Sequence, residues 1–254
     1  MKKLPNILSK FAPLITITIL FSLWELGVRL YGVEPWILPS PLQVANALIT
    51  SANVLVHHTL TTLMEALLGF MVSIILAITV AFLLTNINWL NKAFYPLLIV
   101  SQTIPLITLA ILFTIWFGWG LLPKVLVVVL VCFFPITINL INGLNSVDID
   151  QVALFHSMGA SSWDTFKMVR FPHALPAFFT GLKISATYSV MAAVVGEWLG
   201  AKQGLGYFMT ITQKSFAIDK VIAAVVVICI ISLILVKIIE IAEYFLIPWN
   251  RLNQ

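Results

Sequence analysis

The sequence predicts an all-α polytopic membrane protein with about six transmembrane helices, and two observations lead there. First, 61% of the 254 residues are hydrophobic and only 9% are charged, whereas a soluble domain carries roughly 25% charged residues. Second, the apolar residues form long runs with little or no charge. A helix needs about 20 apolar residues to cross the hydrocarbon core and a barrel strand needs only about 9–11, so these runs predict helices.

The ends of the apolar runs predict where each helix begins and ends. We expect helices over residues 11–31, 57–85, 93–117, 123–143, 175–198 and 221–247. The third should be interrupted near Pro96 and Pro105. Residues 32–51 contain three prolines and should lie outside the membrane, with a short interfacial helix near residues 43–49. One substantial loop, residues 145–173, is expected on the inner side.

The basic residues predict the orientation of the chain. With the N-terminus inside, six spans leave nine of the 14 basic residues on the inner side: Lys2, Lys3, Lys10, Lys92, Lys167, Arg170, Lys183, Lys237 and Arg251. Such an excess favours a cytoplasmic N-terminus and a cytoplasmic C-terminus in the cell membrane. The basic residues form no stripe or run, so the net charge of +4 does not indicate a nucleic-acid partner.

Ionisable side chains inside a bilayer cost roughly 2.5–3.5 kcal/mol each at a helix centre, so each is a functional candidate. Glu25 and Arg29 are spaced i, i+4 and are expected to form a structural pair. Lys183 lies about two turns into its helix, and its long side chain can reach the inner interface.

Two carboxylates are candidates for a water-filled path or its gate. Glu65 lies in the outer half of its helix, where a role in the path and a structural ion pair both stay open. Glu197 ends its helix just before an outer loop that contains Gly204 and Gly206. It is either part of a gate or an interfacial acid that the loop hydrogen-bonds.

No pattern of catalytic or metal-binding residues is visible. The sequence has no GxxxxGK[ST] phosphate loop, no HExxH and no GxSxG, so we expect no catalytic site and no cofactor. His57 and His58 are adjacent, and adjacent positions on a helix point about 100° apart, which makes a poor metal pair. Cys132 and Cys229 lie in apolar runs and are expected to be packing residues.

The inner loop begins with a helical pattern. Asp148 stands at its start, where a carboxylate favours the helix dipole. Apolar residues follow at helical spacing at Val152, Phe155 and Met158. Gly159 then ends this helix in the way that a left-handed cap does.

A second short helix is expected after the glycine. Ser161 or Ser162 can cap it, and Asp164 lies in its first turn. Pro172 and Pro176 should end the pattern before the next span. Two short helices would then lie across the cytoplasmic face, where a partner protein could hold them; an ordinary amphipathic interfacial loop is the alternative.

The spacing from Gly159 over nine residues to the segment 169–172 resembles the EAA-type loop of permease subunits of binding-protein-dependent ABC importers. In that pattern the first position is an acid, and here it is Ala153. The resemblance assigns coupling to an ATPase to these residues of the loop: Ala153, Leu154, Phe155, His156, Ser157, Met158, Gly159, Ala160, Ser161 and Pro172.

Further segments along the chain resemble the taurine, sulfonate and nitrate permease group of these importers. They are residues 38–41 (LPSP), 116–120 (WFGWG), 134–135 (FP), 196–200 (GEWLG) and 204–207 (GLGY). Within the group, residues 196–207 look most similar to permeases for pyrimidine precursors of thiamine.

This resemblance implies a pore subunit of type I fold that has no catalytic site of its own. Two copies would form the path, separate ATPase subunits would dock beneath the inner loops, and an extracellular or periplasmic binding protein would deliver a small polar solute. Residues 1–55 would hold the N-terminal tip, first helix and external segment, residues 56–247 the permease core, and residues 248–254 a short cytoplasmic tail.

Two alternatives remain at this point. An ion-coupled secondary transporter would need carboxylates near the membrane midplane, for which Glu65 is the candidate. A non-transport membrane protein, such as a membrane enzyme or assembly factor, would need a cluster of reactive residues at one membrane face, and the sequence shows none.

Overall fold

The computed structural model describes residues 7–249, and the side chains of residues 11–249. This part of the chain forms helices and no strands. Five helices are long and apolar enough to cross a membrane, and a bent pair of shorter helices brings the number of candidate spans to six if the pair is counted as one span. The predicted all-α polytopic fold is therefore confirmed. Lys2, Lys3 and Arg251 of the predicted cytoplasmic ends lie outside the described residues.

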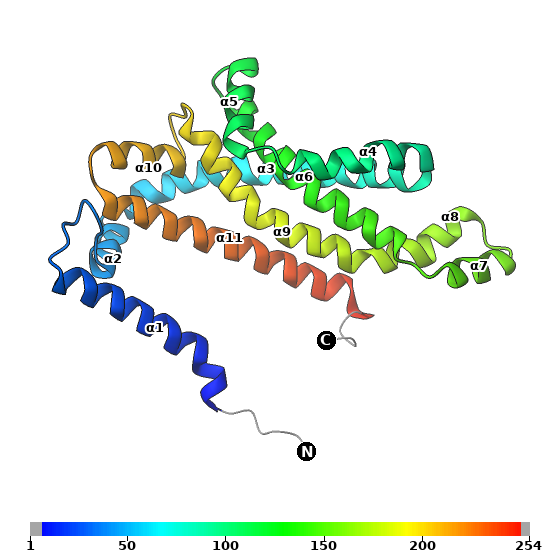
Figure 1. Cartoon of the computed structure of the whole chain (residues 1–254), viewed down its shortest axis with the longest axis horizontal. Helices are drawn as coiled ribbons and strands as arrows, with labels where there is room; N and C mark the ends of the chain where they lie inside the picture. The colour runs from blue at the N-terminus through cyan, green and yellow to red at the C-terminus, as the bar shows by residue number, and fades with distance from the viewer. Residues whose placement is uncertain (1–6, 250–254) are drawn as a thin grey trace. The chain divides into compact units, whose positions relative to one another are not determined.

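The chain divides into two compact units, residues 1–57 with 208–227 and residues 58–207 with 228–254. The first unit contains α1 (Ile7–Leu30) and α2 (Pro41–Thr50), together with parts of α3 (Ala52–Asn86), α10 (Leu205–Lys214) and α11 (Ile218–Leu246) (Figure 1). α2 is the predicted short helix of the external segment.

Glu25 forms an ion pair within α1 and also accepts a hydrogen bond from the start of α2. The Nε of Arg29 donates to Oε1 of Glu25 over 2.5 Å, which confirms the predicted i, i+4 pair. The other carboxylate oxygen of Glu25 accepts from the backbone N–H of Leu42 over 3.2 Å. α2 begins with a capping box between Ser40 and Gln43, which satisfies two of the backbone donors at the helix start.

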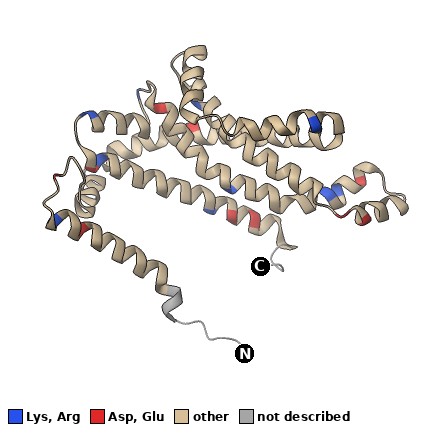
Figure 2. Cartoon of the chain, viewed as in Figure 1, with Lys and Arg blue, Asp and Glu red and all other residues tan. Residues whose placement is uncertain are grey.

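The second unit contains most of α3 and the spans around it: α4 (Asn88–Ser101), α5 (Leu106–Phe117), α6 (Leu121–Asn145) and α9 (Phe171–Trp198). Between α6 and α9 lie α7 (Ile149–Ser157), α8 (Ser162–Thr165) and a π turn at Phe166–Arg170. Figure 2 shows long stretches of α3, α5 and α6 without a charged residue, as a hydrocarbon environment requires.

α6 and α9 run antiparallel and pack closely along their whole length. A Cβ on Gly143, near the end of α6, would lie 3.0 Å from the Cα of Ala174 at the start of α9. At the opposite ends, a Cβ on Gly196 would lie 3.3 Å from the Cα of Lys124. Small residues therefore let the two backbones approach, which is how helices associate in lipid.

The middle of the α6–α9 contact adds hydrogen bonds to this close packing. A Cβ on Gly181 would lie 3.0 Å from the Cα of Ile136, so any other residue there would push the two backbones apart by a few tenths of an ångström. The Ser185 hydroxyl donates to the carbonyl of Cys132 over 2.9 Å, and the Cys132 thiol donates to the carbonyl of Ser185 over 3.4 Å. Cys132 is fully buried, so it is a packing residue, as predicted.

α3 lies beside α6 in the same direction. Gly69 packs against Val128, and the Ser73 hydroxyl donates to the carbonyl of Val129 over 2.9 Å. Further along, buried side chains of α3, α4, α6 and α9 close the bundle in one apolar cluster: Ala81, Leu84, Leu98, Leu140, Ile141, Leu144 and Ala174.

The predicted interruption of the third span occurs at one of the two prolines. Pro96 lies inside α4, whereas the chain leaves the helix after Ser101 and α5 starts only after Pro105. The two helices are bent by 101°. Proline disfavours the helical conformation of the residue before it and lacks an N–H, so Pro105 begins α5 and cannot continue α4.

Three expectations for residues 162–220 need correction. Pro172 and Pro176 do not end the helix, because α8 continues through the π turn into α9 as one helical stretch, residues 162–198. There is thus no separate second helix across the face. Pro172 lies two residues after the π turn at Phe166–Arg170, so it falls at an irregular point of this stretch. The outer loop predicted for residues 200–220 contains the helix α10.

Lys183 has a partner that the sequence did not identify. Its Nζ lies 2.8 Å from Oε2 of Glu243 in α11, and both side chains are partly buried. The charge is therefore neutralised within the protein as well as being placed toward one end of its helix.

Candidate functional site

The segment around Gly159 is an exposed helix with a well-defined cap at each end. The carboxylate of Asp148 caps α7 by accepting from the backbone N–H of Asp150 over 2.9 Å. No residue of α7 is buried. Leu154 and Met158 are 58% and 76% exposed, so the helix presents apolar side chains that nothing in the described chain covers.

Gly159 ends α7 with the left-handed geometry that the sequence predicted, at φ +85°. The N–H of Gly159 donates to the carbonyl of His156, and the N–H of Ala160 donates to the carbonyl of Phe155, both over 3.0 Å. These two bonds define a Schellman cap. A Cβ on Gly159 would meet nothing within 4 Å, so the glycine is required by backbone conformation and not by space.

The next helix starts two residues later. Ser161 and Asp164 form a capping box: the N–H of Ser161 donates to Asp164 over 3.1 Å, and the N–H of Asp164 donates to the Ser161 hydroxyl over 3.2 Å. Trp163 stacks on Phe166, and Phe166 meets the edge of Phe82 on α3. The loop is thereby tied to the bundle.

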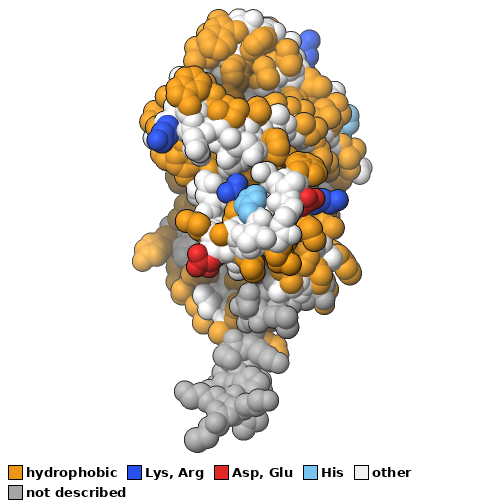
Figure 3. All heavy atoms as spheres, turned by 90° about the vertical axis from the view of Figure 1, so that its right-hand side faces the viewer, with side chains coloured by type: hydrophobic (Ala, Val, Ile, Leu, Met, Phe, Trp, Pro, Cys, Tyr) orange, Lys and Arg blue, Asp and Glu red, His pale blue; other side chains and the backbone are white. Residues whose placement is uncertain are grey.

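Of the predicted coupling set, residues 153–160 lie in the second half of α7 and its cap, Ser161 caps α8, and Pro172 lies at the start of α9. Figure 3 looks onto the end of the molecule that carries α7 and α8. It shows basic, acidic and histidine side chains among hydrophobic ones. Ala153 is exposed and carries no charge, so this surface offers apolar contact where the resembling motif offers an acid.

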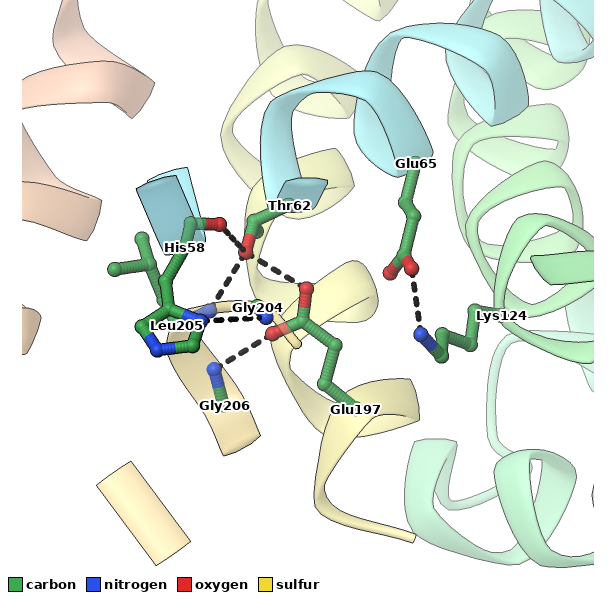
Figure 4. A network of polar contacts seen from close by, with 8 residues as sticks. All are labelled: His58, Thr62, Glu65, Lys124, Glu197, Gly204, Leu205 and Gly206. Carbon is green, nitrogen blue, oxygen red and sulfur yellow. Dashed lines mark hydrogen bonds and ion pairs between the residues drawn. The ribbon is translucent and has the colours of Figure 1, made fainter. Parts of the chain in front are cut away.

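The predicted path residues Glu65 and Glu197 lie in a buried polar cluster at the other ends of α6 and α9 (Figure 4). Glu65 is 1% exposed, and its Oε1 lies 2.6 Å from Nζ of Lys124. Its Oε2 is buried and has no hydrogen-bond partner in the described part of the chain. Of the two interpretations that the sequence left open, the ion pair is present.

Glu197 binds both a side chain and the glycine loop. Its Oε1 accepts from the Thr62 hydroxyl over 2.7 Å, and its Oε2 accepts from the N–H of Gly206 over 2.6 Å. Thr62 in turn accepts from the N–H of Leu205 over 2.8 Å. Glu197 is 1% exposed, and the hydrogen bond from the loop that the second interpretation predicted is present.

His58 completes the cluster. Its Nδ1 accepts from the N–H of Gly204 over 3.1 Å, which fixes the neutral tautomer with the proton on Nε2. Three successive backbone donors, at residues 204–206, are therefore held by side chains of α3 and α9. A Cβ on Gly204, whose φ is +111°, would collide with the Glu197 carboxylate.

Sequence reasoning found the two acids and the two glycines but missed Thr62, His58 as a loop acceptor, and Lys124. Lys124 could have been recognised as a candidate from the sequence, since it is a cation close to the start of an otherwise uncharged helix. The cluster contains one cation and two carboxylates in a water-poor environment. Buried hydrogen bonds from residues 204–206 to His58, Thr62 and Glu197 hold this segment on α3 and α9.

The bundle of apolar helices, with an exposed capped loop at one end and a buried polar cluster at the other, defines a polytopic membrane protein. The family follows from its sequence. Residues 69–251 match the binding-protein-dependent transport system inner membrane component family, and the chain belongs to that family, the permeases of ABC importers. The suspected resemblance is thereby confirmed.

Several characterised relatives align over nearly the whole chain. The formylaminopyrimidine transport permease protein ThiX of Halalkalibacterium halodurans is 38% identical over 240 residues, 94% of this chain and 96% of that protein. The riboflavin transport system permease protein RibX of Chloroflexus aurantiacus is 35% identical, over 93% and 89%. The taurine transport system permease protein TauC of Escherichia coli is 27% identical, over 92% and 88%.

Solved structures show the same fold. A chain of an amino acid ABC transporter superposes with a TM-score of 0.65 at 16% identity, covering 78% of this chain and 97% of that one. A chain of the inward-facing MetNI methionine ABC transporter gives 0.63 at 19% identity, over 78% and 97%. The helical core of this chain is thus the permease fold of ABC transporters.

Proposed function

We propose that this chain is the pore-forming subunit of an importer in the cell membrane that moves a small polar solute. Separate ATPase subunits drive the transport, and an extracellular or periplasmic binding protein delivers the solute. Two copies of the chain form the path across the bilayer. Residues 56–247 are the permease core, residues 1–55 the N-terminal cytoplasmic tip, first transmembrane helix and external segment, and residues 248–254 a short cytoplasmic tail.

In this proposal both termini face the cytoplasm, as the basic residues predict. The α7 end then meets the ATPase subunits, and the polar cluster lies at the outer end, below the binding protein. Glu65, Glu197, Gly204 and Gly206 form part of the outer gate. They hold the loop that must separate from α3 when the path opens outward.

The observation that supports the proposal most directly is that α7 is a short, capped and fully exposed helix. A nine-residue helix with no buried side chain gains little from folding against the bundle, yet it is capped at both ends and followed at once by the helix that becomes α9. The exposed side chains of Leu154 and Met158 supply an apolar contact of the kind found at the centre of protein interfaces. Docking here relies on apolar burial, since Ala153 replaces the acid.

We propose a pyrimidine precursor of thiamine as the solute, because the formylaminopyrimidine permease ThiX is 38% identical to this chain over almost its whole length. Taurine, a sulfonate or nitrate is the alternative, as the taurine permease TauC also aligns over the full chain.

The coupling role is tested by Gly159→Asp in the complex with the ATPase and the binding protein, reconstituted in nanodiscs. Gly32→Asp is the matched control, since Gly32 also has a positive φ, +58°, and open space around its Cβ position. The two variants therefore carry a similar backbone strain in different units of the chain. We expect Gly159→Asp to abolish the stimulation of ATP hydrolysis by the binding protein and Gly32→Asp to retain it.

Wild-type stimulation in Gly159→Asp would disprove the coupling assignment. Solute uptake by the wild type in the absence of the ATPase and of ATP would instead favour an ion-coupled transporter. A pull-down of the full-length chain from membranes that recovers no ATPase would contradict the importer itself.

A further inference from the structure

A cavity of about 230 Å³ lies beside the bend between α4 and α5. Its walls come from the bend, from the middle of α6 and from α9. The lining residues are Ser101, Gln102, Ile104, Leu106, Leu109, Leu130, Val131, Phe134, Pro135, Tyr188 and Met191. The sequence singled out the bend and Phe134-Pro135, but neither has a role in the two sites described above.

The cavity lies at mid-depth of the membrane-spanning bundle. On α6 it is lined between Leu130 and Pro135. At a rise of about 1.5 Å per residue, these positions are each about 14–15 Å from the nearer end of that 25-residue helix. The cavity is therefore near the centre of a hydrocarbon core about 30 Å thick.

The bend supplies backbone acceptors at this depth. The N–H groups of Gln102 and Ile104 donate to the carbonyls of Ile99 and Ser101 over 3.2 and 3.3 Å. Within the described residues, the carbonyls of Gln102 and Ile104 accept no backbone hydrogen bond. Irregular backbone is tolerated inside a membrane where it lines a cavity, and these two residues, whose carbonyls have no backbone donor, are among those that line this one.

Side chains add further polar groups and two rings. The amide of Gln102 and the hydroxyl of Tyr188 make no hydrogen bond to the rest of the described chain, and Tyr188 is 43% exposed. Phe134 and Tyr188 offer aromatic faces. Among the residues that line the cavity, none is Asp, Glu, Lys, Arg or His.

We propose that this cavity is a solute site within the membrane and that it selects an uncharged, ring-shaped solute that carries N–H donors. The class is an amino-substituted heteroaromatic molecule. Its N–H groups would donate to the free carbonyls, its ring would lie against Phe134 or Tyr188, and the Gln102 amide would pair with adjacent donor and acceptor atoms. This inference rests on the proposed function and gives its path a location and a chemistry.

The same geometry selects against sulfonates and nitrate. An anion in this cavity would face carbonyl oxygens, with no cation among the lining residues to offset the loss of its hydration. A solute-binding site for such anions would be expected to contain Arg or Lys.

The test measures the access of a thiol reagent to the cavity in the purified full-length chain. Met191→Cys places a thiol in the lining, and Met71→Cys on α3 is the matched control. The two methionines are 45% and 52% exposed, and Met71 does not line the cavity. Both variants are made with Cys229→Ser, because Cys229 is exposed, and labelled with a small maleimide with and without formylaminopyrimidine or taurine.

We expect formylaminopyrimidine to slow the labelling of Met191→Cys about threefold when its concentration is about twice its dissociation constant, because only the empty site reacts. Labelling of Met71→Cys should not change, and taurine should protect neither position. Adding Gln102→Leu should remove the protection at residue 191. Adding Thr103→Val, at the same bend but outside the lining, should preserve it.

Equal protection by taurine, or no protection by formylaminopyrimidine, would overturn the proposal. So would protection that survives Gln102→Leu. These measurements use neither ATPase nor binding protein, so their failure is distinct from failure of the proposed function, which would appear as absent stimulation of ATP hydrolysis in the unmutated complex.

Discussion

Replacing Lys124 by methionine should destabilise the protein strongly, because it removes the cation of the buried polar cluster. Lys124 and Glu65 have side-chain exposures of 13% and 2%, and their charged atoms are 2.6 Å apart. Removing one partner of a buried ion pair typically costs about 3–5 kcal/mol, since the other charge stays buried without compensation. For a chain of this size, that is a fall in Tm of about 6–20 °C.

The assay is the Tm of the purified chain, followed as the loss of monodisperse protein on heating. Lys237→Met is the control: its ion pair with Glu240 has a similar length, 2.8 Å, but both side chains are exposed. Exposed pairs contribute little, so its Tm should stay within about 2 °C. Adding Glu65→Gln to Lys124→Met should restore part of the loss, because the orphaned charge is gone.

Equal melting temperatures for Lys124→Met and Lys237→Met would refute the reasoning. They would mean that water reaches the cluster and screens it. A double variant that is less stable than Lys124→Met would show instead that Glu65 contributes through another contact, and the compensation argument would fail.

Two glycines allow further tests by the same assay. Gly204→Ala should lower the stability by about 1–3 kcal/mol, because it strains a positive φ and drives a methyl group into the Glu197 carboxylate, whereas Gly27→Ala, with nothing within 4 Å, should be neutral. Gly181→Leu should separate α6 from α9 and abolish the monodisperse protein, since overpacking at a backbone contact cannot relax; a normal elution profile for this variant would contradict the close packing of the two helices.

The spans, their order and the local motifs could be predicted because each depends on residues close in sequence. The Glu25–Arg29 pair, the short helix after Ser40 and the left-handed cap at Gly159 all depend on interactions within a few residues. The predicted helix over residues 57–85 and the observed α3 (Ala52–Asn86) differ mainly at the start, where residues 52–56 extend the helix before the two histidines.

The partners of the buried charges could not be predicted, because they come from distant parts of the chain. Lys124 and Glu65 are 59 residues apart, and Thr62 and Glu197 are 135 apart. Helices that are apolar on every side give no periodicity to indicate which faces meet. The residues that bring α6 and α9 together are small ones such as Gly181 and Ser185, which contribute little to a hydropathy pattern.

The continuous helix from Ser162 to Trp198 connects the α7 end of the bundle to the buried polar cluster at the other end. Its 37 residues extend about 55 Å at 1.5 Å per residue. One end follows the Schellman cap at Gly159, and the other carries the carboxylate that holds the 204–206 loop. Its two irregular points, the π turn and Pro176, lie within its first 15 residues, so bending is concentrated there. A displacement of α7 would therefore bend the helix first at these two points, and the regular helix beyond Pro176 would tilt as one stiff arm that ends at Glu197.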